Sequence, residues 1–525
     1  HQRSKNIRHD MAISSESNYF SVVFMSVIGA FLLALACINY VNIAIASAAK
    51  RLKEIGVRKS IGATQRVVIV QFLSENLLTT FFALVFGLIF GLTFFIPGFE
   101  LLWNFSMDFR LDDPRLFIFL ATLLFLTGMV SGFYPSLYIS RFQVVNILKG
   151  TVKFGQRSPM TKFFLCFQLV MSCVFITCAV YFAQNTTYLS ERSWGYDQDR
   201  AMYAMVSNKA DYEKLAAAMA QLPDVEKISG SAHQVGKTHT TTVIEFPDRD
   251  LEVDRLAVDA GYFETMGLKV MEGRGFRSHE GSDRQAVIVN ENFVRSLAGT
   301  GQDAVGTAFR IDSLEYEVIG VVRDFHNYSF KNEVRPIIFT VAPPDEFRFL
   351  SLRVHPGSEM RTYQSLQARW RELFPEMPFE GGLQRDVWGF YFEEIGIYGL
   401  VWKVISFIAV SLAILGLYGL VRLNVAGRTK EFSIRKVLGA GVKNIATTIA
   451  SHYAVLLVVA ITLGAPAGFF FSKWIIETSY VYHKPTTLSG VALGIAIMLI
   501  VIALTFLTQI RKVVKANAVS GLAEQ

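Results

Sequence analysis

The sequence predicts an α-helical integral membrane protein with seven transmembrane helices and one α/β domain outside the membrane. Three observations support this fold class. Only 18% of the 525 residues are charged and 52% are hydrophobic, whereas soluble proteins carry about 25% charged residues. The hydrophobic residues are gathered in long runs without charge. One long segment with mixed strand and helix patterns, residues 185–395, separates these runs into two groups.

Seven runs are long enough to cross the hydrocarbon core, which takes roughly 20 apolar residues in a helix. They are residues 21–48, 76–99, 116–140, 163–190, 404–421, 444–472 and 485–510. His452 is the only Asp, Glu, Lys, Arg or His in them. Buried helices of a large soluble protein are the alternative, but they rarely give seven such runs.

The short loops alternate between basic and non-basic, which predicts the topology. Residues 49–71 hold six Lys and Arg, and residues 141–162 and 425–451 hold five each. Basic loops remain in the cytoplasm, so these loops and the C-terminus are expected there, and residues 185–395 outside. The net charge of +7 comes mostly from these basic loops, which also attract anionic lipid headgroups. No nucleic-acid partner is expected, because the outer segment holds more acidic than basic residues.

Residues 51–63 and 428–440 are two copies of one segment, with seven identities in thirteen positions. The identical residues are Arg51, Lys53, Glu54, Arg58, Lys59, Gly62 and Ala63 in the first copy, and Arg428, Lys430, Glu431, Arg435, Lys436, Gly439 and Ala440 in the second. Each copy is preceded by one span and followed by two. The chain therefore contains two three-span units in the same orientation, 21–150 and 398–525, with one further helix, 162–184, before the outer domain.

The repeated segment predicts a short amphipathic helix on the cytoplasmic surface. Gly62 and Gly439 suit a left-handed helix stop, and Thr64 can cap the helix that follows. A helix that only anchors in lipid headgroups is one interpretation. The acidic residues Glu54 and Glu431, which do not help lipid binding, favour a protein partner.

The outer segment predicts an α/β domain of one or two lobes. The strands expected are 201–207, 286–290 and 316–322, and the helices expected are 212–222, 290–299 and 362–373. Asp324 and His326 are close in sequence, but an Asp that caps a turn is the simpler interpretation. With no metal-ligand spacing, phosphate loop, HExxH or GxSxG motif, the chain is expected to be neither an enzyme nor a metal or cofactor protein.

Several stretches together resemble the FtsX-like, MacB-type ABC transporter permeases, and in particular the long duplicated form. RTKEFSIRKVLGA and RLKEIGVRKSIGA resemble the family's signature loop, and GYFETMGLKVMEGRGF, residues 261–276, resembles the core of its periplasmic domain. AVIVNENFVRSLAG and VGTAFRIDSLEYEVIGVVRDF follow in the family's order. The resemblance covers nearly the whole chain.

The resemblance implies a permease subunit in the bacterial inner membrane with a periplasmic outer domain. A separate cytoplasmic ABC ATPase dimer would bind ATP and Mg and would dock on the two coupling segments, 50–63 and 427–440. Its closure would move the spans and the outer domain, with a periplasmic adaptor or effector as a further partner. The substrate would be amphipathic: a peptide, lipid, lipoprotein or drug. The alternative is a signalling permease that activates a periplasmic partner such as a cell-wall hydrolase.

Two further expectations complete the interpretation. An ion-driven secondary transporter is disfavoured, because such carriers place ionisable residues inside the membrane. The duplicated family has an outer domain before each three-span unit, and here only the second unit has one. Residues 1–20 are therefore expected to be the tail of a missing first outer domain, preceded by a missing first helix.

Overall fold

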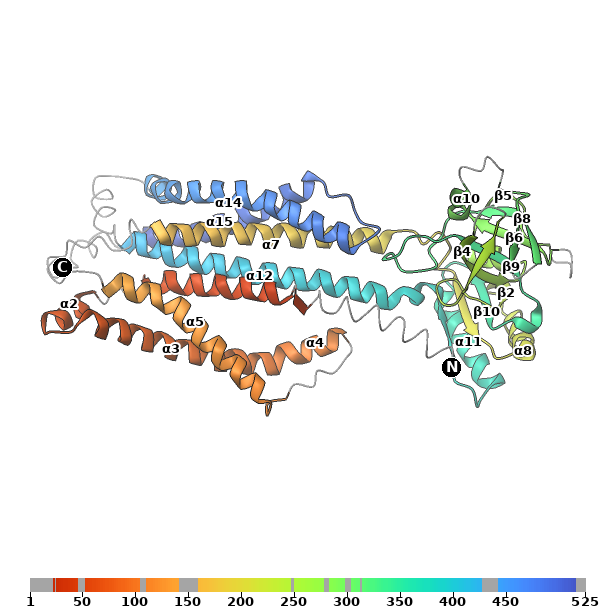
Figure 1. Ribbon diagram of the computed structural model, residues 1–525, viewed down its shortest axis with the longest axis horizontal. Helices are drawn as coiled ribbons and strands as arrows, with labels where there is room; N and C mark the ends of the chain where they lie inside the picture. Colours follow the sequence, from red (N-terminus) through yellow and green to blue (C-terminus); the bar gives the residue numbers. More distant parts are fainter. Residues whose placement is uncertain are drawn as a thin grey trace. The chain divides into compact units, whose positions relative to one another are not determined.

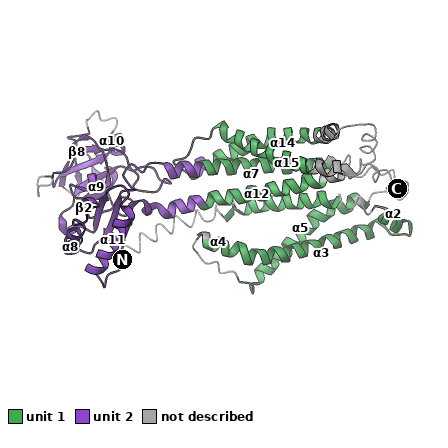
Figure 2. Cartoon of the chain, turned by 180° about the vertical axis from the view of Figure 1, so that it is seen from behind, with its two compact units in different colours: residues 1–184, 397–475, 485–525 green, residues 185–396, 476–484 purple. Residues whose placement is uncertain are grey.

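The computed structural model describes the chain in ten stretches, and 1–20 lies outside them. The described residues are 22–23, 25–45, 52–103, 110–140, 159–246, 250–277, 283–297, 304–311, 314–426 and 442–515. The chain divides into two compact units (Figure 2). We call them the membrane unit, which comprises 1–184, 397–475 and 485–525, and the outer unit, which comprises 185–396 and 476–484.

Seven of the described helices are long and apolar enough to cross a membrane, which confirms the predicted number. They are Met25–Ile45, α3 (Gln65–Phe90), α5 (Pro114–Ser140), α7 (Pro159–Glu191), α12 (Gly389–Ala426), α14 (Val442–Ser479) and α15 (Leu488–Lys515). A π-helical turn, Gly91–Phe95, continues α3 into α4 (Ile96–Trp103). The apolar runs located the spans but underestimated their lengths, because several helices extend into sequence that carries charge.

Two helices are much longer than a bilayer requires. The 33 residues of α7 and the 38 of α12 correspond to about 50 Å and 57 Å at 1.5 Å per residue, against a hydrocarbon core of about 30 Å. The last residue of α7, Glu191, and the first of α12, Gly389, both belong to the outer unit. The chain therefore passes from one unit to the other within each of these helices.

Small residues let α14 and α15 approach α7 closely in the membrane unit (Figure 1). A Cβ at Gly464 would lie 2.8 Å from the Cβ of Cys173, and a Cβ at Gly468 would lie 2.8 Å from the Cβ of Thr177. On α15, a Cβ at Gly494 would lie 3.0 Å from the Oγ1 of Thr177. Glycines four residues apart are a common way to pack helices within lipid, where no hydrophobic force drives helix association.

The outer unit is built on an 11-stranded sheet with short helices. The strands are β1 (Ala201–Met205), β2 (Val225–Ser231), β3 (Thr240–Glu245), β4 (Asp250–Val258), β5 (Val270–Gly273), β6 (Ala286–Asn290), β7 (Ala308–Ile311), β8 (Leu314–Val322), β9 (Ile337–Val341), β10 (Phe349–Val354) and β11 (Gly381–Leu383). The helices are α8 (Lys209–Met219), α9 (Tyr262–Met266), α10 (Glu291–Leu297) and α11 (Glu359–Leu373), with 3-10 turns at Pro344–Glu346 and Gln384–Trp388. The predicted α/β class is confirmed, and all six predicted elements are present.

The sheet forms two lobes with separate cores. In the first lobe β11, β1, β10 and β2 are antiparallel, and α8 and α11 pack on them around Leu215, Leu366 and Trp370 (Figure 1). In the second lobe β4, β3, β7, β8, β6 and β9 close into a ring, because β9 pairs with both β6 and β4. Val287 and Phe309 are buried in that ring. A closed ring has no free sheet edges, which protects the lobe from pairing with other chains.

Candidate functional site

The first coupling segment folds into a short helix with a defined stop. Helix α2 (Leu52–Ser60) ends at Gly62, whose φ of +105° lies in the left-handed region. The Gly62 amide donates to the Lys59 carbonyl at 3.1 Å, and the Ala63 amide donates to the Arg58 carbonyl at 3.0 Å. This pair of hydrogen bonds is a Schellman motif. The predicted left-handed stop is confirmed at this position.

The same segment is fixed to the start of the second span. Thr64 caps α3 by accepting a hydrogen bond from the Val67 amide, as the sequence predicted. On its inner face α2 buries Ile55 against Val68 and Phe72 of α3. The stop, the cap and this apolar contact together hold α2 in a defined corner against the start of α3.

The charges of α2 mostly bind residues of the same three-span unit. The Arg58 guanidinium contacts Glu54 at 2.8 Å and donates to the Gln71 amide oxygen at 2.7 Å. The Lys59 ammonium donates to the Ser140 carbonyl of α5 at 2.6 Å. Helix α2 is therefore bound to both α3 and α5. Glu54 and Arg58 remain about half exposed, at 44% and 48%.

Two apolar side chains on this corner were not singled out as contact residues from the sequence. Val57 is 48% exposed and Ile61 is 81% exposed. Because both are exposed, the corner presents apolar groups near the Glu54–Arg58 pair in the sequence. The repeat indicated that these two positions are apolar in both copies, because the second copy has Ile434 and Leu438 there.

Most of the other predicted docking residues cannot be placed. The second coupling segment lies outside the described residues, as does Arg51, and the side chain of Lys53 is not described. The residues concerned in the second segment are Arg428, Lys430, Glu431, Arg435, Lys436 and Gly439. The docking role of both segments remains a prediction.

Aromatic side chains from four passages of the chain pack together in the outer unit. We call Trp194, His326, Phe330, Trp388, Tyr391 and Tyr482 the base cluster. Trp194, directly after α7, stacks on Phe330 at 4.0 Å and on Trp388 at 4.9 Å between ring centroids. Trp388 ends the 3-10 turn before α12, Tyr391 lies in the first turn of α12, and Phe330 lies between β8 and β9. Trp194 is only 1% exposed, so it fills the centre of the cluster.

The loop between α14 and α15 joins the same cluster through Tyr482. Its ring packs edge-on against His326, with 4.9 Å between centroids, and the Arg192 guanidinium lies 4.4 Å from its centroid. Its hydroxyl accepts a hydrogen bond from the Val334 amide at 3.2 Å. A neighbouring ion pair, Lys331 with Glu394 at 2.7 Å, ties the loop after β8 to α12. Every membrane-helix end in the outer unit is thus attached to one core.

Burial within this cluster, and then the charge of Arg192, lower the pKa of His326 to about 4. In the unfolded chain the imidazole of His326 becomes protonated below its ordinary pKa of about 6.5. In the folded chain it becomes protonated only near pH 4. Stability is therefore complete above pH 6.5 and is lost as the pH falls towards 4, by about 3 kcal/mol for this group. His233, whose pKa burial also lowers to about 4, adds to the effect.

We expect His326→Phe to reduce this pH dependence. The measurement is chemical unfolding of the full chain at pH 7 and pH 4.5, followed by tryptophan fluorescence. His355→Phe, at an exposed position outside the base cluster, is the matched control and should leave the wild-type difference between the two pH values. An unchanged difference in His326→Phe would contradict the assignment.

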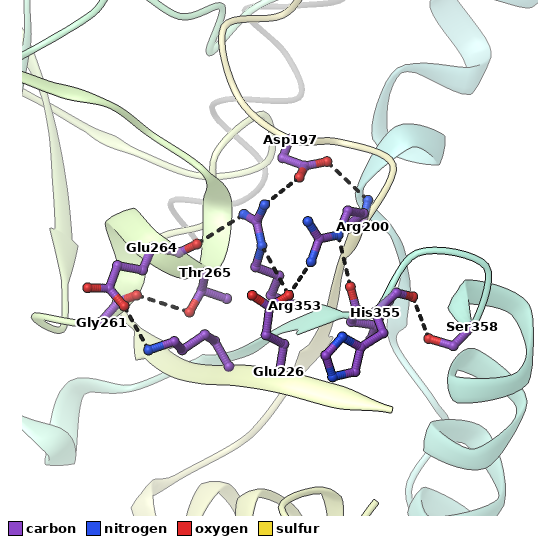
Figure 3. Close-up of polar contacts among 11 residues, drawn as sticks. Asp197, Arg200, Glu226, Gly261, Glu264, Thr265, Arg353, His355 and Ser358 are labelled. Carbon is purple, nitrogen blue, oxygen red and sulfur yellow. Dashed lines mark hydrogen bonds and ion pairs between the residues drawn. The ribbon is translucent and has the colours of Figure 1, made fainter. Parts of the chain in front are cut away.

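A cleft of about 1030 Å³ opens on the outer unit beside the base cluster. Figure 3 shows the ion pairs at one wall. Arg353 of β10 contacts the Asp197 carboxylate at 2.7 Å and donates to the Glu264 carbonyl at 3.0 Å, while its Nε lies 3.7 Å from Glu226. Arg200 also pairs with Glu226. This network joins the loop before β1 to β2, β10 and α9.

The second glycine of the GYFETMG stretch, Gly267, is explained by this wall. Gly267 ends α9 with φ of +67°, and a Cβ there would lie 2.8 Å from the Cβ of Asp197 and 3.0 Å from the Nη1 of Arg353. Only glycine allows the close approach and the left-handed backbone together. This part of the motif therefore serves the fold.

The sequence predicts that Asp324 caps a turn. In the structure it caps helix α10 instead. One carboxylate oxygen accepts hydrogen bonds from the Asn292 amide at 2.8 Å and the Asn290 side chain at 2.9 Å, and the other pairs with Arg295. It thus fixes the N-terminus of α10, where a negative charge is favourable. His326 belongs to the base cluster instead, so the two residues serve separate contacts.

Two family models match the chain. The FtsX-like permease C-terminal model matches residues 26–144 and 403–518, and the MacB-like periplasmic core domain model matches residues 137–369. The two FtsX-like matches lie within the segments 21–150 and 398–525 that the repeat delimits.

Two curated relatives are similar to parts of the chain. The chain is 22% identical over 216 residues to the macrolide export ATP-binding/permease protein MacB of Sodalis glossinidius, covering 38% of this chain and 32% of that protein. It is 31% identical over 97 residues to the MacB protein of Bdellovibrio bacteriovorus, covering 15% of each. The chain therefore spans about a third or less of the length of these relatives.

Solved structures with similarity to part of the chain are also found. The periplasmic region of MacB from Actinobacillus actinomycetemcomitans matches at 12% identity and TM-score 0.29, covering 38% of this chain and 95% of that one. The extracellular domain of the noncanonic ABC-type transporter YknZ from Gram-positive bacteria matches at 14% identity and TM-score 0.27, covering 35% of this chain and 98% of that one.

Proposed function

The chain is an FtsX/MacB-type permease, a multi-pass membrane protein with a periplasmic domain, and from this we propose that it couples a separate ATPase to movement of that domain. In the proposed mechanism ATP and Mg are bound by a cytoplasmic ABC ATPase dimer. The permease converts the closure of that dimer into motion on the outer side, where an amphipathic substrate is exported or extracted. The membrane is the bacterial inner membrane, and the C-terminus is cytoplasmic.

Helix α2 supports the input side of this proposal. Its Schellman stop and the burial of Ile55 fix it to α3, and the Lys59 contact fixes it to α5. A rigid corner is what a docking element needs, because a flexible one would absorb the motion of the partner. The exposed Val57 and Ile61 supply apolar contact area beside the half-exposed charges of Glu54 and Arg58. Interfaces commonly combine such an apolar centre with a polar rim.

The base cluster supports the output side, and it is the single observation that carries the proposal. The ends of α7 and α12 and the loop joining α14 to α15 all terminate in one buried aromatic core of the outer unit. Packed cores switch between discrete arrangements and do not deform gradually. Movement of any one of these helices would therefore displace the segment between β8 and β9, which contains Phe330 and His326.

The proposed mechanism needs no reaction chemistry in this chain. The two matched domains are a permease region and a periplasmic core domain, which are not catalytic. The relatives named above are ATP-binding/permease proteins. The family models match this chain in a permease region and a periplasmic core domain, and the ATPase is proposed as a partner subunit.

Distance measurements between the two units test the proposal. Spin labels at Glu213→Cys on α8 and Ser489→Cys on α15, in a background without the four native cysteines, would report motion between the outer and membrane units. We expect the distance distribution to change between the nucleotide-free complex with the ATPase and the complex trapped with ATP and vanadate. If the complex hydrolyses ATP but the distance distribution does not change, either at this label pair or at a second one, mechanical coupling is overturned.

A further inference from the structure

The cleft of the outer unit carries positive charges that its own acids do not balance. Six basic and five acidic side chains line it. The acidic groups all have partners: Asp197 with Arg353, Glu226 with Arg200, Glu264 with Lys227, Asp324 with Arg295, and Glu291 with the Asp324 amide. Among the described residues, Arg192, Lys269 and Arg323 are the lining cations without an acidic partner.

Two of these cations flank adjacent strands, Lys269 directly before β5 and Arg323 directly after β8. The Arg323 amide donates to the Lys269 carbonyl at 3.0 Å, and the register of β5 with β8 sets Val270 opposite Val322. Lys269 and Arg323 are therefore directly opposite each other, and both line the cleft. Like charges in directly opposite positions destabilise a sheet. An anion bound between Lys269 and Arg323 would therefore be favourable at this wall of the cleft.

The third cation has unused hydrogen-bonding capacity. Arg192 donates through Nη1 to the Tyr188 hydroxyl at 2.7 Å and lies over the Tyr482 ring, but its Nε is buried and has no hydrogen-bond partner among the described residues. A buried, unsatisfied donor on a charged group costs free energy. Val334 and Tyr482 line the same cleft and offer apolar surface next to these charges.

We propose that this cleft binds the phosphate or carboxylate group of an organic anion, which Lys269 and Arg323 hold with Arg192 as the third cation. The organic body of the ligand lies against Val334 and Tyr482. The inference goes beyond the proposed function, because it concerns binding to the outer unit and holds whether or not an ATPase drives the permease. The ligand group comes either from a soluble molecule or from a lipid headgroup.

Phenyl phosphate is a suitable probe, because it joins a phosphate to a small apolar body and does not insert into bilayers. We would titrate it, by calorimetry, into the full chain in nanodiscs of neutral phosphatidylcholine, with benzyl alcohol as the uncharged analogue. Saturable binding of phenyl phosphate but not of benzyl alcohol is expected. The variant Lys269→Gln/Arg323→Gln should bind at least about tenfold more weakly, since charge-assisted hydrogen bonds to phosphate are lost. Lys269→Arg/Arg323→Lys should retain binding.

The matched control is Lys209→Gln/Arg369→Gln, which removes the same charge from α8 and α11 outside the cleft. It should bind as the wild type does. Thermal unfolding checks the fold: the cleft variant should be at least as stable as the wild type, because the cross-strand repulsion is gone. No binding by the wild type, or equal weakening in the cleft and control variants, would overturn the proposal. If anionic lipid added to the nanodisc abolishes phenyl phosphate binding, the ligand group is a lipid headgroup; if it does not, the ligand is soluble.

Discussion

Replacing Glu54 and Glu431 together by Lys should prevent the permease from retaining its ATPase while leaving membrane insertion intact. The two acids occupy the same position in both copies of the coupling segment, so a symmetric partner would meet both. Reversal turns attraction into like-charge repulsion, which costs several kcal/mol at an interface. The affinity is expected to fall by about 100-fold or more. Co-purification of a tagged ATPase subunit with the permease measures this loss.

The fold should tolerate the change. Glu54 is 44% exposed and pairs with Arg58 one helical turn away, and such exposed pairs contribute only about 0.3–0.5 kcal/mol. Asp112→Lys, at an exposed position in the loop before α5, makes the same charge change away from the coupling segments. It should leave the ATPase bound. Co-purification at the wild-type level in the Glu54→Lys/Glu431→Lys variant would argue strongly against the docking role.

The membrane helices and the coupling helix were predictable because their signals are local. A charge-free run sets a span by length alone, and the glycine at Gly62 with Thr64 after it specifies a stop and a cap within a few residues. The limits of α7 and α12 were less predictable. Their ends carry charged residues such as Glu394, because these turns pack in the outer unit and not in lipid.

The outer unit was predictable by class but not by topology. The strand signals at 201–207, 286–290 and 316–322 are local alternations, and all three strands exist. The ring depends on β9 pairing with β4 in parallel and with β6 antiparallel. Those partners are more than 45 residues away from β9 in the sequence, and no short pattern encodes such a pairing.

The base cluster and the cleft depend on the same long-range contacts. Trp194 and Trp388 stack across nearly two hundred residues of sequence, and Tyr482 belongs to a loop between two membrane spans. Each residue alone is an ordinary aromatic at a helix end. The opposite placement of Lys269 and Arg323 becomes visible only once the register of β5 and β8 is known. The sequence shows that acidic residues outnumber basic ones in the outer segment as a whole. This overall excess hides the surplus of cations at the cleft.

Trp194→Ala should destabilise the outer unit by about 3–5 kcal/mol, the usual cost of removing a buried Trp side chain. The side chain is 1% exposed and contacts four other rings of the cluster, which cannot close the space that it would leave. The end of α7 would then lose its main attachment to Phe330 and to the start of α12. In the complex with the ATPase, we expect ATP hydrolysis to continue while the change in spin-label distance is lost.

Trp194→Phe separates packing from hydrogen bonding in this effect. The indole Nε1 is buried and has no hydrogen-bond partner among the described residues, so its removal should cost little, and a smaller ring preserves stacking on Phe330 and Trp388. We therefore expect this variant to retain most of the stability and the distance change. Chemical unfolding and the spin-label measurement on both variants decide the matter. If Trp194→Ala unfolds like the wild type and still transmits the motion, the base cluster is not the connection between the helices and the outer unit. Loss of the distance change in Trp194→Phe at wild-type stability would show instead that the indole N–H itself takes part in the moving state.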